Sequence, residues 1–271
     1  KVDRWTNQSF SGLYTSKVVP PNSFSNPEVF LKNTIFNANE STAIVTKDGL
    51  ILYFTKNNFK KNTNKKNAKD EVTLKIYSAH FKNGQWKDVT ELPFNSDNYN
   101  CAHPALSADE KTLYFTSNMP GTTGQSDLYR VSVLGNGVFG TPENLGATIN
   151  TEGRETFPFI SSEGELYFAS DGHLGLGGLD VFVSKINADA SFSKPVNLGN
   201  PINTAFDDFS YVVNSQTHVG YFSSNRPGGK GSDDIYKFTE DKSLIEEKEK
   251  FSLFSDMILL ARFGKLEIIF V

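Results

Sequence analysis

ETFPFISSEGELYFASDGHLGLGGLDVFVSKI, residues 155–186, is the stretch that decides the fold. Its two β-prone apolar runs are separated by the turn sequence Ser162–Gly164, and a glycine-rich loop leads from the second run to a third. A short fourth strand is expected at 194–199, where Pro195 is typical of an edge strand. The stretch therefore predicts four short antiparallel strands within about 50 residues.

The same unit recurs along the chain. A Tyr-Phe pair closes the second strand of each unit, and successive pairs are 61, 53 and 54 residues apart. In the last three units an Asp always follows the Tyr of the pair by 13 residues. A fixed period with four strands is typical of β-propeller blades, and a β-sandwich would not produce the constant spacing. The pairs are Tyr53-Phe54, Tyr114-Phe115, Tyr167-Phe168 and Tyr221-Phe222.

We therefore predict an all-β fold, a β-propeller of four-stranded antiparallel blades. About five blades with incomplete terminal blades are expected, and six blades is the alternative. Residues 10–15 and 28–31 are expected to be the third and fourth strands of a first blade that lacks its inner two. The propeller is assigned to residues 1–242.

Residues 243–271 form a charged and then apolar tail of uncertain structure. We expect this tail to stay outside the blades. The competing expectation is that the β-prone residues 266–271 close an open sheet edge, which would otherwise expose unpaired backbone groups. The first residues lack an initiator Met and begin within a strand-like pattern, so a piece of a longer protein is expected.

Composition narrows the classes of function. The 271 residues include 27 basic and 31 acidic side chains, and a net charge of −4 argues against a sequence-independent nucleic-acid binder. The single Cys101 excludes an internal disulfide, and no apolar run has membrane-spanning length. The four His residues lack metal-ligand spacing, and no phosphate or dinucleotide motif is present. No metal and no cofactor are therefore expected.

Several motifs resemble those of known propellers. Thr46–Phe54 and Ser107–Phe115 resemble the WD-type repeat of TolB-like propellers. Five further segments resemble the propeller region of OmpA-family envelope proteins of Bacteroidetes-type bacteria: 92–97, 103–107, 142–146, 177–182 and 221–229. The resemblance covers about residues 5–242.

This resemblance implies a non-enzymatic binding or scaffold module in the periplasm or at the outer membrane of a Gram-negative bacterium. Its partner would be an envelope protein or a cell-wall glycan. Proteins of this kind carry helical repeats before the propeller and a peptidoglycan-binding OmpA-like domain after it, and some serve the type IX secretion apparatus. Neither flanking domain lies in this chain, and the stretch 251–271 does not resemble the family's continuation.

The loops that join second to third strands emerge on the same face of a propeller as the loops that join blades. Here both classes are rich in Gly, Asn and acids, and glycine allows close backbone approach. We predict that this face, the loop face, binds the partner. Gly and Asx residues also close turns, so a turn-closing role for single residues stays open. The candidate binding residues are Glu40, His103, Asn118, Arg154, Glu155, Asp171, His173, Asp207, Asp208, Asn225 and Arg226.

Two further groups of acids need an interpretation. Asp127, Asp180 and Asp234 each precede a third strand and are predicted to accept backbone N–H groups as structural residues. The alternative function is a glycoside hydrolase, in which Glu40, Glu155 and Asp208 would converge at the channel mouth. That chemistry needs two carboxyl groups about 5–5.5 Å or about 6.5–9.5 Å apart.

Overall fold

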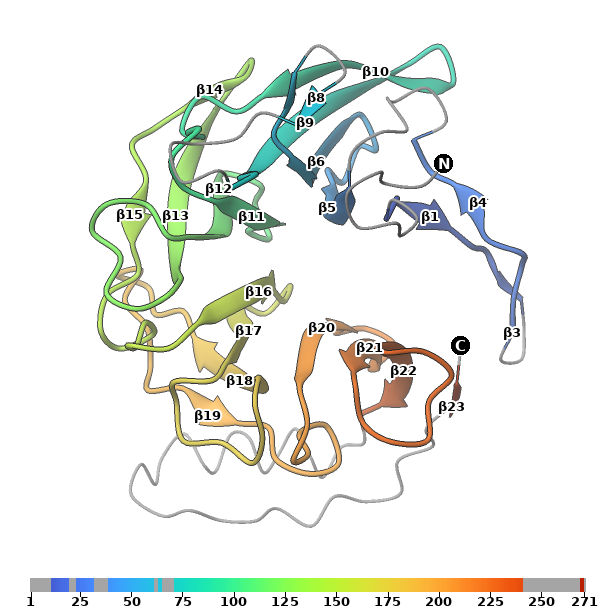
Figure 1. Ribbon diagram of the computed structural model, residues 1–271, viewed down its shortest axis with the longest axis vertical. Helices are drawn as coiled ribbons and strands as arrows, with labels where there is room; N and C mark the ends of the chain where they lie inside the picture. Colours follow the sequence, from blue (N-terminus) through green and yellow to red (C-terminus); the bar gives the residue numbers. More distant parts are fainter. Residues whose placement is uncertain are drawn as a thin grey trace. The chain divides into compact units, whose positions relative to one another are not determined.

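The computed structural model describes residues 11–19, 23–31, 39–60, 63–64, 71–240 and 269–270. Within these ranges every regular element is a β-strand, and neighbouring strands of each sheet run antiparallel where their register is defined (Figure 1). The chain divides into two compact units. Unit 1 comprises Lys1–Thr122 and Tyr129–Glu143, and unit 2 comprises Thr123–Leu128 and Asn144–Val271.

Unit 1 contains a four-stranded sheet and most of a second sheet. The first sheet has the strand order β10-β9-β6-β5. The second sheet has the strand order β11-β12-β13-β14, and β15 also pairs with β13. Asp127 and Leu128 at the start of β13 belong to unit 2. The bounds are β5 Glu40–Val45, β6 Ile51–Asn57, β9 Leu74–Lys82, β10 Gln85–Glu91, β11 Cys101–Leu106, β12 Thr112–Ser117, β13 Asp127–Gly135, β14 Val138–Phe139 and β15 Glu143–Asn144.

Three short strand pairs complete the described part of unit 1. β1 (Tyr14–Thr15) pairs with β4 (Glu28–Val29), and their hairpin extends into the pair β2 (Val18–Val19) and β3 (Ser23–Phe24). The pairing of β1 with β4 agrees with the expected third and fourth strands of an incomplete first blade. The basic insertion after β6 holds the pair β7 and β8, whose bounds are Phe59–Lys60 and Thr63–Asn64.

Unit 2 contains two four-stranded sheets, ordered β16-β17-β18-β19 and β20-β21-β22-β23. The bounds are β16 Glu155–Ile160, β17 Glu165–Ser170, β18 Asp180–Lys185, β19 Val196–Asn197, β20 Asp208–Asn214, β21 Val219–Ser224, β22 Asp234–Thr239 and β23 Ile269–Phe270. The prediction of an all-β fold built from four-stranded antiparallel blades is confirmed.

The last sheet obtains its fourth strand from the far end of the chain. Phe270 and Ile269 pair with Tyr236 and Lys237 of β22. The expectation that the tail stays outside the blades does not hold for these two residues, because their pairing satisfies backbone groups at an otherwise open edge. The proposed boundary at residue 242 falls among residues 241–268, outside the described residues, and stays a prediction.

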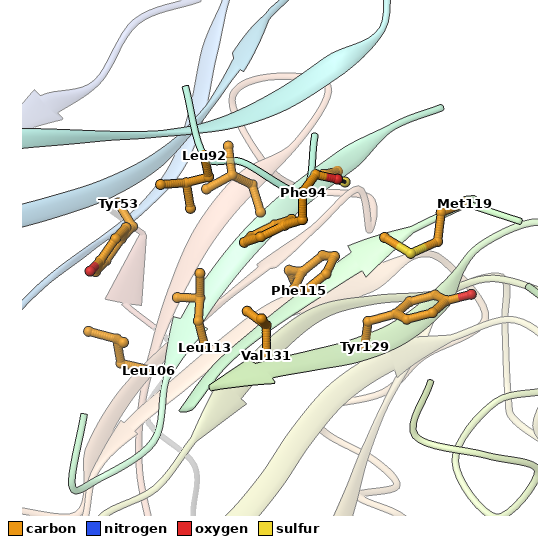
Figure 2. Packing of buried hydrophobic residues seen from close by; sticks show 11 residues of the cluster. Tyr53, Leu92, Phe94, Leu106, Leu113, Phe115, Met119, Tyr129 and Val131 are labelled. Atoms are coloured by element: carbon orange, nitrogen blue, oxygen red, sulfur yellow. Dashed lines mark hydrogen bonds between the residues drawn. The ribbon is translucent and has the colours of Figure 1, made fainter. Parts of the chain in front are cut away.

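The Tyr-Phe pairs fill the cores on the two faces of each sheet. Tyr53 lies in one apolar cluster with Phe94 and Phe115 (Figure 2), whereas Phe54 lies in another cluster with Leu52. This division follows from the alternation of side chains along a strand. The first three pairs are buried on both members, and in the fourth pair Phe222 is buried while Tyr221 is half-buried.

A β-bulge recurs in the first strand of each sheet. One residue there takes a positive φ, and the register against the second strand shifts around it. A bulge places an extra residue opposite its partner strand and turns the local side chains. The four residues are Thr42, His103, Phe157 and Ser210, with φ of 25°, 56°, 50° and 53°.

Candidate functional site

The loop face of unit 2 is built by close backbone contacts between its loops. A Cβ atom at Gly177 would collide with the backbone of residues 204–206, so only glycine allows the loop 171–179 to lie against the loop 204–207. Gly124 makes the equivalent approach to the backbone of residues 151–153. The glycines of this face therefore hold loops together, which is a packing role.

The Asp residues before the third strands bind the loops that lead to them. Asp127 accepts hydrogen bonds from Thr123 N at 2.8 Å and from Asn144 Nδ2 at 2.7 Å. Asp180 accepts from the backbone N–H groups of residues 176 and 177 at 2.6 and 3.0 Å, and Asp234 accepts from that of residue 230 at 2.9 Å. This is the geometry expected of structural acceptors, and the assignment stays our interpretation. Burial raises the pKa of Asp180, and the hydrogen bonds from Gly177 and Leu176 oppose that shift.

The sheet β10-β9-β6-β5 has the opposite charge at the same repeat position. Lys75 occupies it, with a side chain that is 2% exposed. Its Nζ lies 2.6 Å from Glu91 Oε1 and 2.7 Å from Asp97 Oδ1. The position therefore holds a charged side chain that binds neighbouring groups, and its sign changes between sheets.

The acids at the starts of the first strands are buried and paired. Glu155 accepts hydrogen bonds from the N–H and hydroxyl of Thr151 at 2.9 and 2.6 Å and from Ser170 Oγ at 2.7 Å. Asp208 accepts from the N–H and hydroxyl of Thr204 at 2.6 and 2.8 Å. Both carboxylates have no exposed surface.

Glu40 holds the equivalent position in unit 1. It is buried and lies opposite Lys56 in the strand register. Burial lowers the pKa of Lys56, and the charge of Glu40 opposes this shift. Glu40, Glu155 and Asp208 thus each face a residue on the neighbouring second strand of their own sheet.

Arg226 makes several contacts within the fold. Its guanidinium donates to Asp208 Oδ1 at 2.5 Å and to the carbonyls of Pro201 and Ile202 at 3.0 and 2.6 Å. The guanidinium carbon also lies 4.9 Å from the ring centroids of both Phe222 and Tyr236. With 11% of its side chain exposed, Arg226 joins loops and core and presents little surface to a ligand.

Asn118, Asp171 and Asn225 share one repeat position at the start of the loop after the second strand. Each side-chain oxygen accepts the N–H of the residue before the first strand of its own sheet, from Asn100 at 2.7 Å, Arg154 at 2.6 Å and Asp207 at 2.9 Å. Arg154 and Asp171 also form an ion pair of 2.7 Å. These residues fix the loops to one another.

The two candidate histidines are also bound within the fold. His103 Nδ1 lies 3.0 Å from the hydroxyl of Thr42, and the backbone N–H of His103 donates to Thr55 Oγ1 at 2.8 Å. Burial lowers the pKa of His103 to about 4. His173 Nε2 lies 2.8 Å from the carbonyl of Ile149, and its ring packs against Phe182. Both rings are half-buried.

A set of asparagines that was not predicted from the sequence clamps the third strands. Asn95, Asn150 and Asn203 each accept the N–H and donate to the C=O of one third-strand residue, at 2.7–3.0 Å. The residues so held are Ile76, Leu128 and Val181. A signal was present in the sequence, because the last two asparagines both follow their partners by 22 residues.

An apolar patch stands on the loop face of unit 2. It consists of Leu174, Leu176 and Phe206, which are 78%, 44% and 42% exposed. The contact of Gly177 with the backbone of residue 206 brings the two loops of the patch together. We call these three residues the Leu174 patch.

Comparisons with known proteins show what the fold resembles. No family model and no curated protein matches the chain. The structure is similar to a protein assigned as a TolB from Agrobacterium tumefaciens, with a TM-score of 0.53 and 14% identity over 91% of this chain and 70% of that chain. The fold is that of a β-propeller. At this identity the likeness shows the fold alone.

Two further solved structures have lower scores. TolB from Acinetobacter baumannii has a TM-score of 0.49 and 13% identity over 79% of this chain and 43% of its own. An α-L-arabinofuranosidase from Lactobacillus brevis has a TM-score of 0.48 and 13% identity over 77% of this chain and 73% of its own. Among the residues that the structure describes, none forms a helix that could cross a membrane.

Proposed function

We propose that this chain is a non-enzymatic docking module of a bacterial envelope protein and that it binds a protein partner through the loop face of unit 2. The observation that carries the proposal is the Leu174 patch. Large apolar side chains that gather on exposed loops are typical of protein-interaction surfaces.

The repeat supplies its own comparison for this patch. The positions of Leu174 and Leu176 are held by Gly121 and Thr123 in the preceding loop, and by Gly228 and Lys230 in the following loop. Those loops form with small or polar residues, so the fold does not require leucine at either position. Exposed leucines that the fold does not need are best explained by a binding role.

The polar candidate residues hold the loops of this face in place. Asp171, Asp207 and Asn225 engage neighbouring backbone N–H groups, and Arg226 and Asp208 hold each other. They fix the loops on which the Leu174 patch stands, and a rigid loop loses less conformational entropy on binding. Because these groups are engaged internally, a protein partner with an apolar anchor fits the face better than a glycan, which needs many available hydrogen-bonding groups.

The same hydrogen bonds argue against the glycoside hydrolase alternative. A general acid or a nucleophile must reach the substrate. Both carboxylate oxygens of Glu155 and of Asp208 accept hydrogen bonds from neighbouring side chains or backbone, and neither residue is exposed. An envelope location, in the periplasm or at the outer membrane, is supported by the resemblance of the repeats to OmpA-family propellers.

The test is a comparison of variants in affinity capture from envelope extracts of the source bacterium. Leu174→Gly combined with Leu176→Thr converts the loop to the residues of the preceding loop. We expect this double variant to lose a partner that the unaltered protein retains. Leu134→Ser is the control, since Leu134 is 64% exposed and lies on β13, outside these loops.

Two outcomes would contradict the proposal. One is equal recovery of every protein by the double variant and the unaltered chain. The other is co-sedimentation with isolated cell-wall glycan that survives the double substitution, which would assign the module to the glycan. Release of nitrophenol from aryl glycosides, abolished by Glu155→Gln, would establish the hydrolase.

A further inference from the structure

The Leu174 patch stands among acidic loops. A Cβ atom at Gly172 would collide with the side chain of Thr151, and one at Gly177 would collide with the backbone of residues 204–206, so the loop with the two leucines contacts both neighbouring loops. The three loops are residues 149–154, 171–180 and 204–208. They contain five Asp or Glu residues and one Arg, so negative charge is in excess around the exposed apolar side chains.

Two of the five carboxylates have a cationic partner. Asp171 forms the ion pair with Arg154, and Asp208 binds Arg226 of the following loop. In the described part of the chain, the carboxylates of these loops without a cationic partner are Glu152, Asp180 and Asp207.

The three remaining carboxylates differ in their surroundings. Asp180 and Asp207 accept hydrogen bonds from neutral donors, which are backbone N–H groups and the amide of Asn225. Burial raises the pKa of Asp180, and the negative charges of Asp208 and Asp207 raise it further. Glu152 is exposed and forms no hydrogen bond or ion pair with the described residues. Its carboxylate is therefore available to a partner.

The repeat shows that the fold does not require an acid at position 152. Glu152 follows its clamp asparagine by two residues, and Ala205 holds the same place in the next inter-blade loop. In the preceding loop this place is held by Asp97, which is bound to Lys75. Glu152 is thus an acid that the repeat does not need and that no neighbouring cation neutralises.

We propose, building on the docking function proposed above, that the partner binds the Leu174 patch with a segment that carries Lys or Arg beside an apolar side chain. The apolar side chain would cover Leu174, Leu176 and Phe206, and the cationic group would reach Glu152 on the neighbouring loop. In such interfaces the apolar anchor supplies most of the affinity, whereas complementary charge sets the choice of partner and the rate of association.

The probes are two fluorescently labelled peptides, GKLFLKG and GELFLEG, which differ only in the sign of the charges beside one apolar core. Each peptide is titrated against the full chain at low salt and followed by anisotropy. We expect saturable binding of the lysine peptide and weaker binding of the glutamate peptide. Salt at about 1 M, which shortens the Debye length to about 3 Å, should reduce the difference between them.

Charge variants of the protein locate the cationic contact. Glu152→Lys should weaken binding of the lysine peptide about 5-fold, as expected for reversing one exposed charge contact. Glu163→Lys is the matched control and should leave binding unchanged, because Glu163 is exposed and lies in the turn between β16 and β17, at the other end of β16 from Glu152. Leu174→Gly combined with Leu176→Thr should abolish saturable binding of the lysine peptide.

Three results would overturn the assignment of a cationic partner: equal binding of the two peptides, no saturable binding of the lysine peptide, or equal effects of Glu152→Lys and Glu163→Lys. The leucine variant separates this failure from that of the docking function. If the leucine variant loses the peptides while Glu152→Lys keeps them, the patch binds a partner of another charge and only the cationic assignment fails. If the leucine variant keeps the lysine peptide at full affinity, the Leu174 patch is not the binding surface, and the docking function fails as well.

Discussion

The side-chain amide of Asn203 pairs with both backbone polar groups of Val181. It accepts the N–H and donates to the C=O, each at 2.8 Å, and both residues are buried. Asn203 Nδ2 also donates to Asn197 Oδ1 at 2.8 Å. One side chain thus joins the loop after the fourth strand to the third strand, beside the backbone hydrogen bond that Leu198 N donates to Val181 O at 3.0 Å.

Replacing Asn203 by Ala should destabilise the protein. The N–H of Val181 would lose its partner away from water, at a cost of about 1–3 kcal/mol, whereas its C=O would keep the hydrogen bond from Leu198 N. Denaturant unfolding measures the loss. Asn98→Ala removes an exposed amide and should change the free energy of unfolding by less than about 0.5 kcal/mol. Similar losses for the two variants would show that the clamp contributes nothing.

Arg226 and Asp208 should depend on each other for stability. Asp208 is fully buried, so Arg226→Met would leave its charge without its cationic partner, which costs about 3–5 kcal/mol. Adding Asp208→Asn should recover part of that loss, because the remaining buried group is neutral. A double variant whose loss equals the sum of the two single losses would contradict this coupling.

The fold followed from the sequence because its signals are local. The Tyr-Phe pairs mark the second strands, and their spacing marks the blades. The roles of Arg226 and Asp208 could not be predicted, because they lie 18 residues apart and meet only when the sheet forms. Charge in a glycine-rich loop is also compatible with ligand binding, which is how Arg226 was interpreted.

Other features were visible in the sequence and not used. The asparagine clamps recur with the repeat, but Asn in a loop is so common that a turn-closing role was the natural interpretation. Leu174 and Leu176 lie in a glycine-rich loop, and the neighbouring loops have no leucine at the equivalent positions. The pairing of β23 with β22 depends on contacts between residues about 33 apart along the chain, which no local pattern encodes.

Stability should fall at acidic pH through His103. Its folded pKa of about 4 lies below the ordinary value of 6.5, because burial disfavours the charged form. The neutral histidine therefore contributes stability that is fully present above pH 6.5 and is lost as the pH falls toward 4. His103→Asn keeps a side chain that tolerates the positive φ and should flatten the pH dependence in this window. An unchanged slope in denaturant titrations from pH 7 to pH 4 would mean that His103 is not its source.

The pairing of β23 with β22 should stabilise the last sheet. Ile269→Pro in the full chain removes a backbone donor and should lower the melting temperature by several degrees, the effect of losing about 1–2 kcal/mol in a domain of this size. If the Ile269→Pro variant has the same melting temperature as the unaltered protein, β23 contributes nothing to the stability of the sheet.

The most direct test of the docking proposal is photo-crosslinking from the Leu174 patch. A photoreactive phenylalanine analogue replaces Leu176 in one variant and Leu134 in another, and both proteins are irradiated in envelope extracts of the source bacterium. We predict a discrete protein adduct from position 176 that is missing from position 134 and is competed away by unlabelled protein. No adduct at 176, or the same adducts from both positions, would contradict a protein-docking role for this face.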